Sequence, residues 1–397
     1  MIEKNNHIEW LSSLKQNGFH GTCIDLFVGA GGLSEGFKMA GFEILAANDL
    51  DGHCAETFRL NNPNIPFFLG PIEKLNAEDF LKAAKIKPGQ LDCIIGGPPC
   101  QAFSVYNHQR GMHDERSGLF KEYLRIVEGI MPRFVVMENV PGMTSVEGGR
   151  AVQEIKSGLS KLGYKVESKI LKAEEFGVPQ ERRRMFFVGS FGNEIKWPLA
   201  THGGGSGLPP FTTVQDAISD LPSLGNAEGA VRLPYIKPVM SSYQRFLREG
   251  SRAVYNHVAP SLSLVNLERM RHIPPGGSWR DIPFSLLPAG MKKARRSDHT
   301  KRYGRLHPEG LACTILTKCD PHWGAFFHYE QDRAITVREA ARLQSFPDSF
   351  RFSGPRAEQY RQVGNAVPVF LAAAIAKSII LSLRKPEEVI HIASRSL

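Results

Sequence analysis

Short apolar runs alternate with amphipathic segments along residues 22–190. The apolar runs are TCIDLF, FEILAAN, PFFL, LDCII and RFVVMEN. Between them lie segments with the apolar spacing of surface helices, such as LSEGFKMAG and SGLFKEYLRIVEGI. Strands separated by helices of this length require parallel crossovers, so the pattern predicts an α/β fold with an open, doubly wound sheet. Ligands bind such sheets beyond the carboxyl ends of the strands, which makes the residues that follow each run candidates for a site.

The alternation stops after MFFVGSF, residues 185–191, and a long irregular stretch begins. It contains GGGSGLPP at 203–210 and IPPGG at 273–277, which favour turns over regular elements. Helical spacing returns in TVREAARLQSF at 336–346 and in the apolar segment at 367–385. This stretch predicts a second, smaller domain, and we expect the terminal helix to pack back on the sheet.

Three segments follow from this pattern, and a chain of 397 residues exceeds what one core usually holds. Residues 1–192 are expected to form the first domain and residues 193–330 the second. Residues 331–397 are expected to return to the first domain and complete it.

Positive charge is concentrated in the irregular segment. The chain carries a formal net charge of +9. Residues 196–330 hold 17 Lys and Arg against 10 Asp and Glu, an excess of seven. This favours a polyanionic partner, although a solvated basic face has the same composition.

Composition also argues against several classes of protein. No apolar run approaches the roughly 20 residues of a membrane span, and residues 1–18 carry acids without an apolar signal core, which favours a cytoplasmic protein. The six cysteines form no CxxC pair, which argues against a zinc site and a disulfide framework.

A glycine-rich loop follows the first apolar run, in DLFVGAGGLSEGF at 25–37. Gly29, Gly31 and Gly32 permit a tight turn and a close approach of the backbone to a ligand. Asp49, twenty residues after Gly29, can accept hydrogen bonds from a ribose. Ser34 stands where a dinucleotide fingerprint has its third glycine. The loop therefore leaves NAD, S-adenosylmethionine and a plain structural turn open.

One cysteine is expected at the same edge of the sheet as the glycine-rich loop. Cys100 ends GGPPC after the fourth apolar run, and Glu138 follows the fifth in MENVPG. Pro98 and Pro99 restrict the backbone before the thiol, which favours a nucleophile over the inert core cysteine that a lone thiol usually is.

The order of these motifs resembles the DNA cytosine-5 methyltransferases, and in particular the bacterial type II modification enzymes. The resemblance rests on DLFVGAGG, GGPPCQAFS, ENVPG, QERRRMFFVG, RAITVREAARLQSFPD and QVGNAVPV, spread over residues 22–380. It implies a Rossmann-like sheet that binds S-adenosylmethionine and releases S-adenosylhomocysteine, with residues 193–330 as a target recognition domain. It also implies a monomer in the cytoplasm, associated with the nucleoid, that acts on double-stranded DNA beside a cognate restriction endonuclease.

The same resemblance assigns roles to individual residues. Cys100 would add to carbon 6 of a flipped-out cytosine, Glu138 would stabilise ring nitrogen 3, and Arg182 and Arg184 would bind the base carbonyl and a phosphate. The cofactor would contact, besides the loop glycines and Asp49, the positions Phe27, Leu50, Ile72, Pro99 and Asn365. DNA would contact Gln101, Ser104, Tyr106, Arg116, Lys292, Lys293, Arg295, Arg296 and Thr314.

Some details depart from the family pattern or stay open. Pro71 replaces a common acidic residue and Leu50 replaces an aromatic, which affects adenine recognition. Lys301, Arg302 and Arg305 extend the basic cluster that could follow phosphates. A methyltransferase for tRNA cytosine and a silent DNA-binding regulator on the same fold are the alternatives, and the basic recognition segment and the intact Cys100 and Glu138 argue against them.

Overall fold

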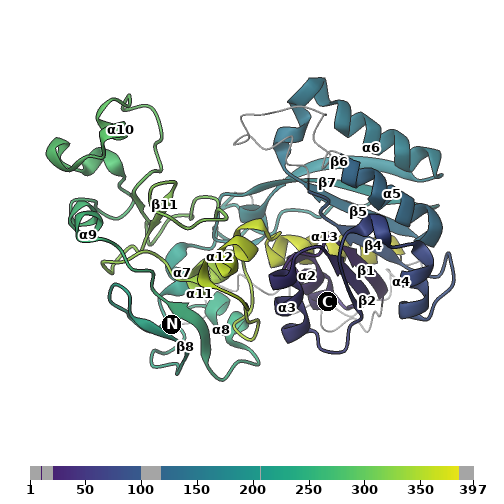
Figure 1. Cartoon of the computed structure of the whole chain (residues 1–397), viewed down its shortest axis with the longest axis horizontal. Coiled ribbons are helices and arrows are strands. Elements are labelled where there is room, and N and C mark those ends of the chain that lie inside the picture. The colour runs from purple at the N-terminus through teal and green to yellow at the C-terminus, as the bar shows by residue number, and fades with distance from the viewer. Residues whose placement is uncertain (1–9, 11–20, 100–117, 206, 384–397) are drawn as a thin grey trace. The chain divides into compact units, whose positions relative to one another are not determined.

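The computed structural model describes residue 10 and residues 21–99, 118–205 and 207–383 (Figure 1). The chain divides into two compact units. The sheet unit comprises Leu11–Lys172, Arg183–Leu199 and Val369–Leu397, and the second unit comprises Met1–Trp10, Ala173–Arg182 and Ala200–Pro368. These boundaries differ from the predicted segments, because residues 331–368 group with the second unit and the return to the sheet begins at Val369.

The sheet unit contains seven hydrogen-bonded strands in the order β3-β2-β1-β4-β5-β7-β6. β7 runs antiparallel to both of its neighbours, and the other pairs are parallel. The predicted α/β sheet is therefore confirmed. The strands are β1 (Gly21–Leu26), β2 (Phe42–Asp49), β3 (Phe67–Leu69), β4 (Cys93–Gly96), β5 (Phe134–Asn139), β6 (Lys165–Lys172) and β7 (Arg183–Ser190).

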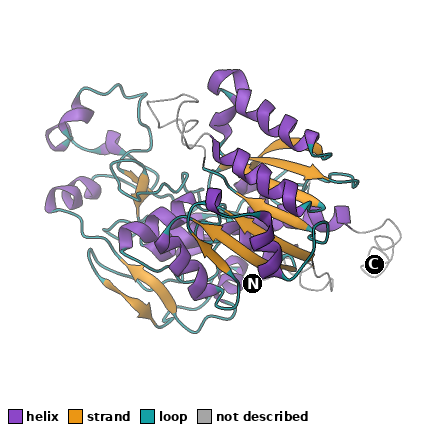
Figure 2. Cartoon of the chain, turned by 45° about the vertical axis from the view of Figure 1, so that its right-hand side comes forward, coloured by secondary structure: helices purple, strands orange, loops and turns teal. Residues whose placement is uncertain are grey.

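Helices cover both faces of this sheet (Figures 1 and 2). α4, α5 and α6 pack in sequence along one face, and α2 packs against α13 on the other, with α3 beside α2. The bounds are α2 (Gly32–Met39), α3 (Gly52–Asn61), α4 (Ala77–Ala84), α5 (Leu119–Ile130), α6 (Arg150–Lys161) and α13 (Val369–Leu383). Short 3-10 turns lie at η1 (Ile72–Lys74), η4 (Pro141–Thr144) and η5 (Val146–Gly149).

α13 explains the most apolar stretch of the chain. Arg356–Leu383, which includes α13, is long and apolar enough to cross a membrane by length and composition. The expectation that no run approaches that length is therefore wrong for this segment. However, 89% of its most apolar window is buried inside the protein, and α13 packs on α2 as predicted for a returning helix.

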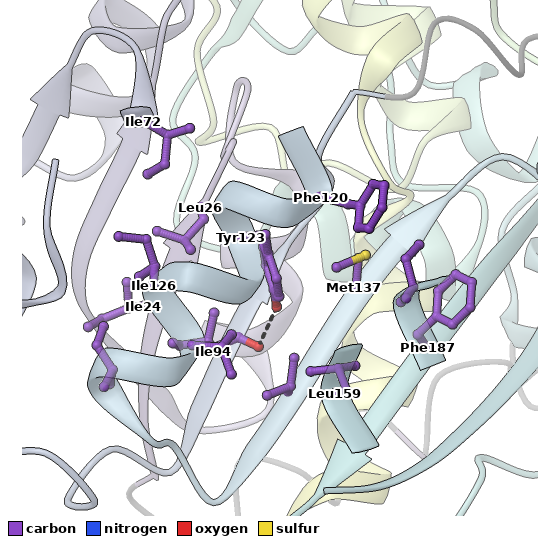
Figure 3. Close-up of a cluster of buried hydrophobic side chains, with 14 of the residues drawn as sticks. Ile24, Leu26, Ile72, Ile94, Phe120, Tyr123, Ile126, Met137, Leu159 and Phe187 are labelled. Carbon is purple, nitrogen blue, oxygen red and sulfur yellow. Dashed lines mark hydrogen bonds between the residues drawn. The ribbon is translucent and has the colours of Figure 1, made fainter. Parts of the chain in front are cut away.

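The core beneath α5 is mainly apolar and includes the buried side chain of Tyr123 (Figure 3). Tyr123 is fully buried, and its hydroxyl donates to the carbonyl oxygens of Ile94 and Val136 at 3.2 and 3.1 Å. These acceptors belong to β4 and β5, so α5 is fixed over the two strands whose ends carry GGPP and Glu138.

The second unit has short elements and long connections. Its helices are α7 (Val214–Ile218), α8 (Ser242–Arg248), α9 (Leu264–Arg271), α10 (Ala289–Lys292), α11 (Val337–Leu343) and α12 (Arg356–Asn365). β8 (Gly229–Leu233) pairs antiparallel with β9 (Val254–Val258), and β10 (Gly304–Arg305) pairs parallel with β11 (Ala325–Phe327). The 3-10 turns are η6 (Ala173–Phe176), η7 (Trp279–Asp281) and η8 (Phe284–Leu286).

Buried arginines hold this unit together around α11. Arg342 forms ion pairs with Asp348 and Asp220, all fully buried. Arg338 donates to the carbonyl oxygens of Tyr255, Pro347 and Phe350. The prediction that Arg338 and Arg342 pair internally is confirmed.

Candidate active site

The glycine loop has a backbone that ordinary residues rarely adopt. Phe27, Gly29 and Gly31 have φ values of 56°, 58° and 100°. A Cβ at Gly29 would meet nothing within 4 Å, whereas one at Gly31 would lie 3.2 Å from the Phe58 ring. Left-handed backbone at a non-glycine residue such as Phe27 is costly and concentrates at ligand sites. The loop therefore has both the strain and the open space expected of a binding loop.

Asp49 at the end of β2 anchors this loop. Its Oδ2 accepts a hydrogen bond from the Gly29 amide at 2.7 Å, and Oδ1 accepts one from Asp51 at 2.9 Å. Burial raises the pKa of Asp49, and these backbone donors oppose the shift. The next residue, Leu50, is 70% exposed, so an apolar side chain lies beside the carboxylate.

A second carboxyl lies beneath the loop. Asp25 is fully buried and accepts a 2.6 Å hydrogen bond from the Ser34 hydroxyl. Burial raises the pKa of Asp25 to about 8, while the bond from Ser34 opposes the shift. Asp25 therefore carries its proton at neutral pH and ties β1 to the first turn of α2. Sequence reasoning did not assign it a role; its position in an apolar run is the signal that could have found it.

The ends of β4 and β5 meet at Glu138. A Cβ at Gly97 would lie 3.1 Å from Glu138 Oε2, closer than most Cβ contacts, so the carboxylate lies directly against the backbone of Gly97. Asn139 donates from Nδ2 to the Pro98 carbonyl at 3.2 Å. These contacts place Glu138 beside the backbone three residues before Cys100. The part played by Asn139 was not predicted, although it lies in the same ENVPG motif.

Arg184 is the partner of Glu138. Its Nε lies 2.7 Å from Glu138 Oε1, and both side chains are nearly buried, at 13% and 12% exposed. Nη1 also donates to the Arg183 carbonyl at 2.8 Å. Burial lowers the pKa of Arg184, and the charge of Glu138 opposes that shift. Because the pair is largely desolvated, its geometry is well defined and its electrostatics are little screened.

Arg182 lies in the second unit and is used internally. It is 1% exposed, and it donates to the carbonyl oxygens of Ile315, Gly364 and Ala366 at 2.7 to 3.0 Å. The Thr314 hydroxyl donates to Glu181 O at 2.7 Å. This arrangement joins the QERRR segment to the Thr314 segment. A contact of Arg182 or Thr314 with DNA stays a prediction.

The basic residues of the second unit fall into two groups. Lys292, Lys293, Arg295 and Arg296 are exposed, on α10 and the segment after it. Arg305 does not join them: it is 7% exposed and donates to the carbonyls of His328 and Met270 and to Asp332.

The remaining predicted residues are distributed as follows. Ile72 is buried, Pro99 is exposed, and Asn365 is exposed at the end of α12 in the second unit. Cys100, Gln101, Ser104, Tyr106 and Arg116 lie outside the described residues.

Comparison with known proteins decides the family. The family model for C-5 cytosine-specific DNA methylases matches residues 21–381. The chain belongs to this family. It is accordingly a DNA cytosine-5 methyltransferase, and the recognition made from the motif series is confirmed.

Relatives of this methyltransferase match it over most of their length. Type II methyltransferase M1.HphI of Haemophilus parahaemolyticus is 37% identical over 90% of this chain and 86% of the relative. M.AgeI of Thalassovita gelatinovora is 33% identical over 91% and 99%. The crystal structure of a putative DNA modification methyltransferase encoded within an E. coli prophage has a TM-score of 0.71 at 27% identity, covering 92% of this chain and 100% of that one.

The loop of the methyltransferase suits the cofactor that its family implies. S-adenosylmethionine carries an adenosine, a sulfonium and an amino acid group. The loop leaves open space at Gly29 for such a group. Asp49 offers a hydrogen-bond acceptor beside it, and the exposed Leu50 offers an apolar surface. Among the described residues, no cluster of three or more His, Cys, Asp or Glu could hold a metal ion.

Three other thiols of the methyltransferase are poorly suited to act as nucleophiles. Burial raises the pKa of Cys23, Cys313 and Cys319, which keeps these thiols protonated. Since the thiolate is the reactive form, they are poor competitors for the role assigned to Cys100.

Proposed function

We propose that this methyltransferase modifies carbon 5 of one cytosine, flipped out of a specific duplex sequence, through a covalent adduct between Cys100 and carbon 6. The observation that carries the proposal is the Arg184–Glu138 pair against Gly97, three residues before Cys100. Cytosine must be activated at two ring positions, carbon 6 and nitrogen 3. A largely buried carboxyl, held by an arginine beside the backbone that leads to a thiol, suits this requirement.

The chemistry assigns one task to each group. The Cys100 thiolate adds to carbon 6, and the electron pair moves through the ring toward nitrogen 3, where Glu138 supplies a proton. Carbon 5 thereby becomes nucleophilic. S-adenosylmethionine, when bound at the loop of Gly29 and Asp49, supplies the methyl group as an electrophilic sulfonium. As carbon 5 takes the methyl group, the ring electrons return from nitrogen 3 and Glu138 takes back its proton. Loss of the carbon 5 proton to solvent then restores the double bond between carbons 5 and 6 and expels the Cys100 thiolate.

Arg184 has a further effect on Glu138. Its guanidinium Nε, 2.7 Å from Glu138 Oε1, fixes the orientation of the carboxyl that acts on the base. The Arg184 guanidinium also donates toward the base carbonyl. Because the base must leave the helical stack to reach these groups, flipping costs a few kcal/mol, which binding energy offsets.

We further infer that the enzyme acts as the modification half of a type II system. The bacterial relatives named as type II methyltransferases support this inference. We propose that the enzyme is a monomer that acts in the cytoplasm on the DNA of the nucleoid. Its partner would be a restriction endonuclease that cuts the same sequence when it is unmodified.

Bisulfite sequencing of plasmid DNA from cells that express the enzyme tests it. We expect protected cytosines in one short motif for the wild type and none for Cys100→Ser. Cys54→Ser is the matched control, because Cys54 lies half-buried on α3 outside the proposed chemistry, and it should protect the same motif. Full protection by Cys100→Ser would refute the adduct. Unprotected DNA in all three would favour an RNA substrate or a silent binder.

A further inference from the structure

Two short parallel strands of the second unit bring an arginine and a tryptophan together. β10 and β11 pair Gly304 with Ala325, and Arg302 and Trp323 each precede the paired residue by two positions. Ahead of the strands, the Tyr303 amide donates to the Pro321 carbonyl at 2.6 Å. The Arg302 guanidinium carbon consequently lies 4.7 Å from the centre of the Trp323 ring.

The platform beneath this pair is fixed from inside the unit. Tyr303 is buried, and its hydroxyl is 2.9 Å from His322 Nδ1. The His322 and Trp323 rings meet edge to face at 5.0 Å between centres. Asp320 accepts from the amide of His322 at its side chain and from that of Trp323 at its carbonyl. Trp323 is nevertheless 49% exposed, so an ordered aromatic face remains open to solvent.

Arg302 is ordered, yet its hydrogen-bond donors are not used inside the protein. Within the part of the chain that the structure describes, no acceptor binds its guanidinium. Arg305, three residues later, and Arg269, whose Nε donates to Leu286 O at 2.7 Å, both bind internal acceptors. A guanidinium stacked on an aromatic ring loses little further freedom when it binds a ligand. This arrangement prepares Arg302 for an external acceptor.

We propose that Arg302, held against Trp323, reads a guanine of the recognition sequence through its O6 and N7 atoms in the major groove. The assignment rests on the proposed action on duplex DNA. A planar guanidinium donates two parallel hydrogen bonds to this edge of guanine, which is the commonest specific contact of arginine with DNA. A contact with phosphate would need only charge, which the exposed Lys301, next to Arg302 in sequence, already provides.

Methylation rates on a set of altered duplexes test the assignment. Once bisulfite sequencing has given the wild-type site, each G·C pair in it is replaced in turn by A·T, and each guanine by 7-deazaguanine, which lacks N7. We expect Arg302→Ala to lower the rate on the intact site about ten- to a hundredfold and to lose discrimination at one G·C pair. 7-Deazaguanine at that pair should slow the wild type and leave Arg302→Ala unchanged.

Two further variants separate this role from others. Arg302→Lys keeps the charge but loses the planar guanidinium that stacks on Trp323 and donates two parallel hydrogen bonds, so it should discriminate less well than the wild type at that pair. Arg351→Ala is the matched control, because the Arg351 guanidinium carbon also lies over an aromatic ring in this unit, 5.2 Å from the centre of the Tyr255 ring. It should keep wild-type base preference.

Several outcomes would overturn the assignment. One is that Arg302→Ala lowers the methylation rate equally on every duplex and weakens its salt dependence, which indicates a phosphate contact. Another is that Arg302→Lys discriminates at that pair as well as the wild type. Wild-type enzyme that methylates no DNA would instead refute the proposed function, and the guanine assignment with it. Wild-type activity with unchanged discrimination in Arg302→Ala would refute the guanine assignment alone.

Discussion

Replacing Glu339 by glutamine should unfold the second unit far more readily than its small change in shape suggests. Glu339 is buried and accepts from Arg333 Nη1 and Nη2 at 2.8 and 2.6 Å and from the Thr336 amide at 2.7 Å. The glutamine amide would face an Arg333 N–H with another N–H, and the arginine would stay buried without its counter-charge. Breaking a buried pair on one side costs about 3–5 kcal/mol.

Urea unfolding measures this loss. Hydrogen–deuterium exchange of peptides from the second unit should follow it, because a chain with two compact units need not unfold in one step. With a slope of roughly 3 kcal/mol per molar urea, the midpoint should fall by about 1 M or more. Glu268→Gln is the matched control: Glu268 pairs with Arg271 at 3.0 Å but is 45% exposed, and it should change stability by less than about 0.5 kcal/mol.

The pH dependence gives an independent check. Arg333 holds the pKa of Glu339 well below its usual range, against the effect of burial. A carboxylate with a depressed pKa stabilises the fold above its unfolded pKa, about 4.3, and this stability is lost as the pH falls further. Glu339→Gln should therefore lose less stability in acid than the wild type. Equal midpoint shifts for Glu339→Gln and Glu268→Gln would show that the buried pair has no special energetic role.

Three other substitutions test the sheet unit. Gly36→Ala should lower the melting temperature, because its Cβ would overlap Ala372 of α13 at a cost of about 1–3 kcal/mol. The control Gly52→Ala, whose Cβ meets nothing within 4 Å, should leave the melting temperature unchanged. Equal melting temperatures for the two variants would refute the packing argument. Glu138→Gln should lower single-turnover methylation more than about a hundredfold and change DNA affinity little, and a near-normal rate would remove it from the proposed chemistry. Asp25, with its pKa raised to about 8, keeps a proton that the unfolded chain releases, so wild-type stability should fall as the pH rises from 4 to 8. Asp25→Asn should reduce this dependence of the unfolding free energy on pH. The same slope in chemical unfolding of wild type and variant would contradict this.

The parts that the sequence predicted well are those with a strong local pattern. β1, β4 and β5 are almost wholly buried and appear as continuous apolar runs, and the helices between the strands have clear amphipathic spacing. β6 was missed because it is an edge strand, and its sequence KVESKILK keeps polar residues on much of its length. The reversed direction of β7 also has no local signal.

The second unit was harder to predict because its order does not come from apolar periodicity. β10 and β11 have two and three residues, too few for a period to be recognised. The side chains that hold the unit, such as Arg182 and Gln180, bind acceptors more than 130 positions away in sequence. Such contacts depend on tertiary structure. The sequence around QERRR alone is compatible with a substrate-binding role for its arginines as well as with a structural role.

The candidate site divides in the same way. Gly29, Asp49 and Glu138 follow strands of the sheet unit, and topology alone predicted that they lie at strand ends. The Arg184–Glu138 pair requires that β7 lie next to β5, with Met185 opposite Asn139. That register was not predictable from spacing, although the motif series indicated both residues.

Charge by itself does not show which basic residues have donors available for DNA. Arg302 and Arg305 lie in one segment, KRYGR, and a count of basic residues treats them alike. In the folded unit Arg305 donates to the carbonyl oxygens of His328 and Met270 and to Asp332, and it could reach DNA only by leaving the two buried carbonyl oxygens without this donor. Arg302 is held by stacking alone and can turn its donors outward without such a loss. The better criterion for a DNA contact in this unit is therefore an ordered arginine whose N–H groups have no internal acceptor.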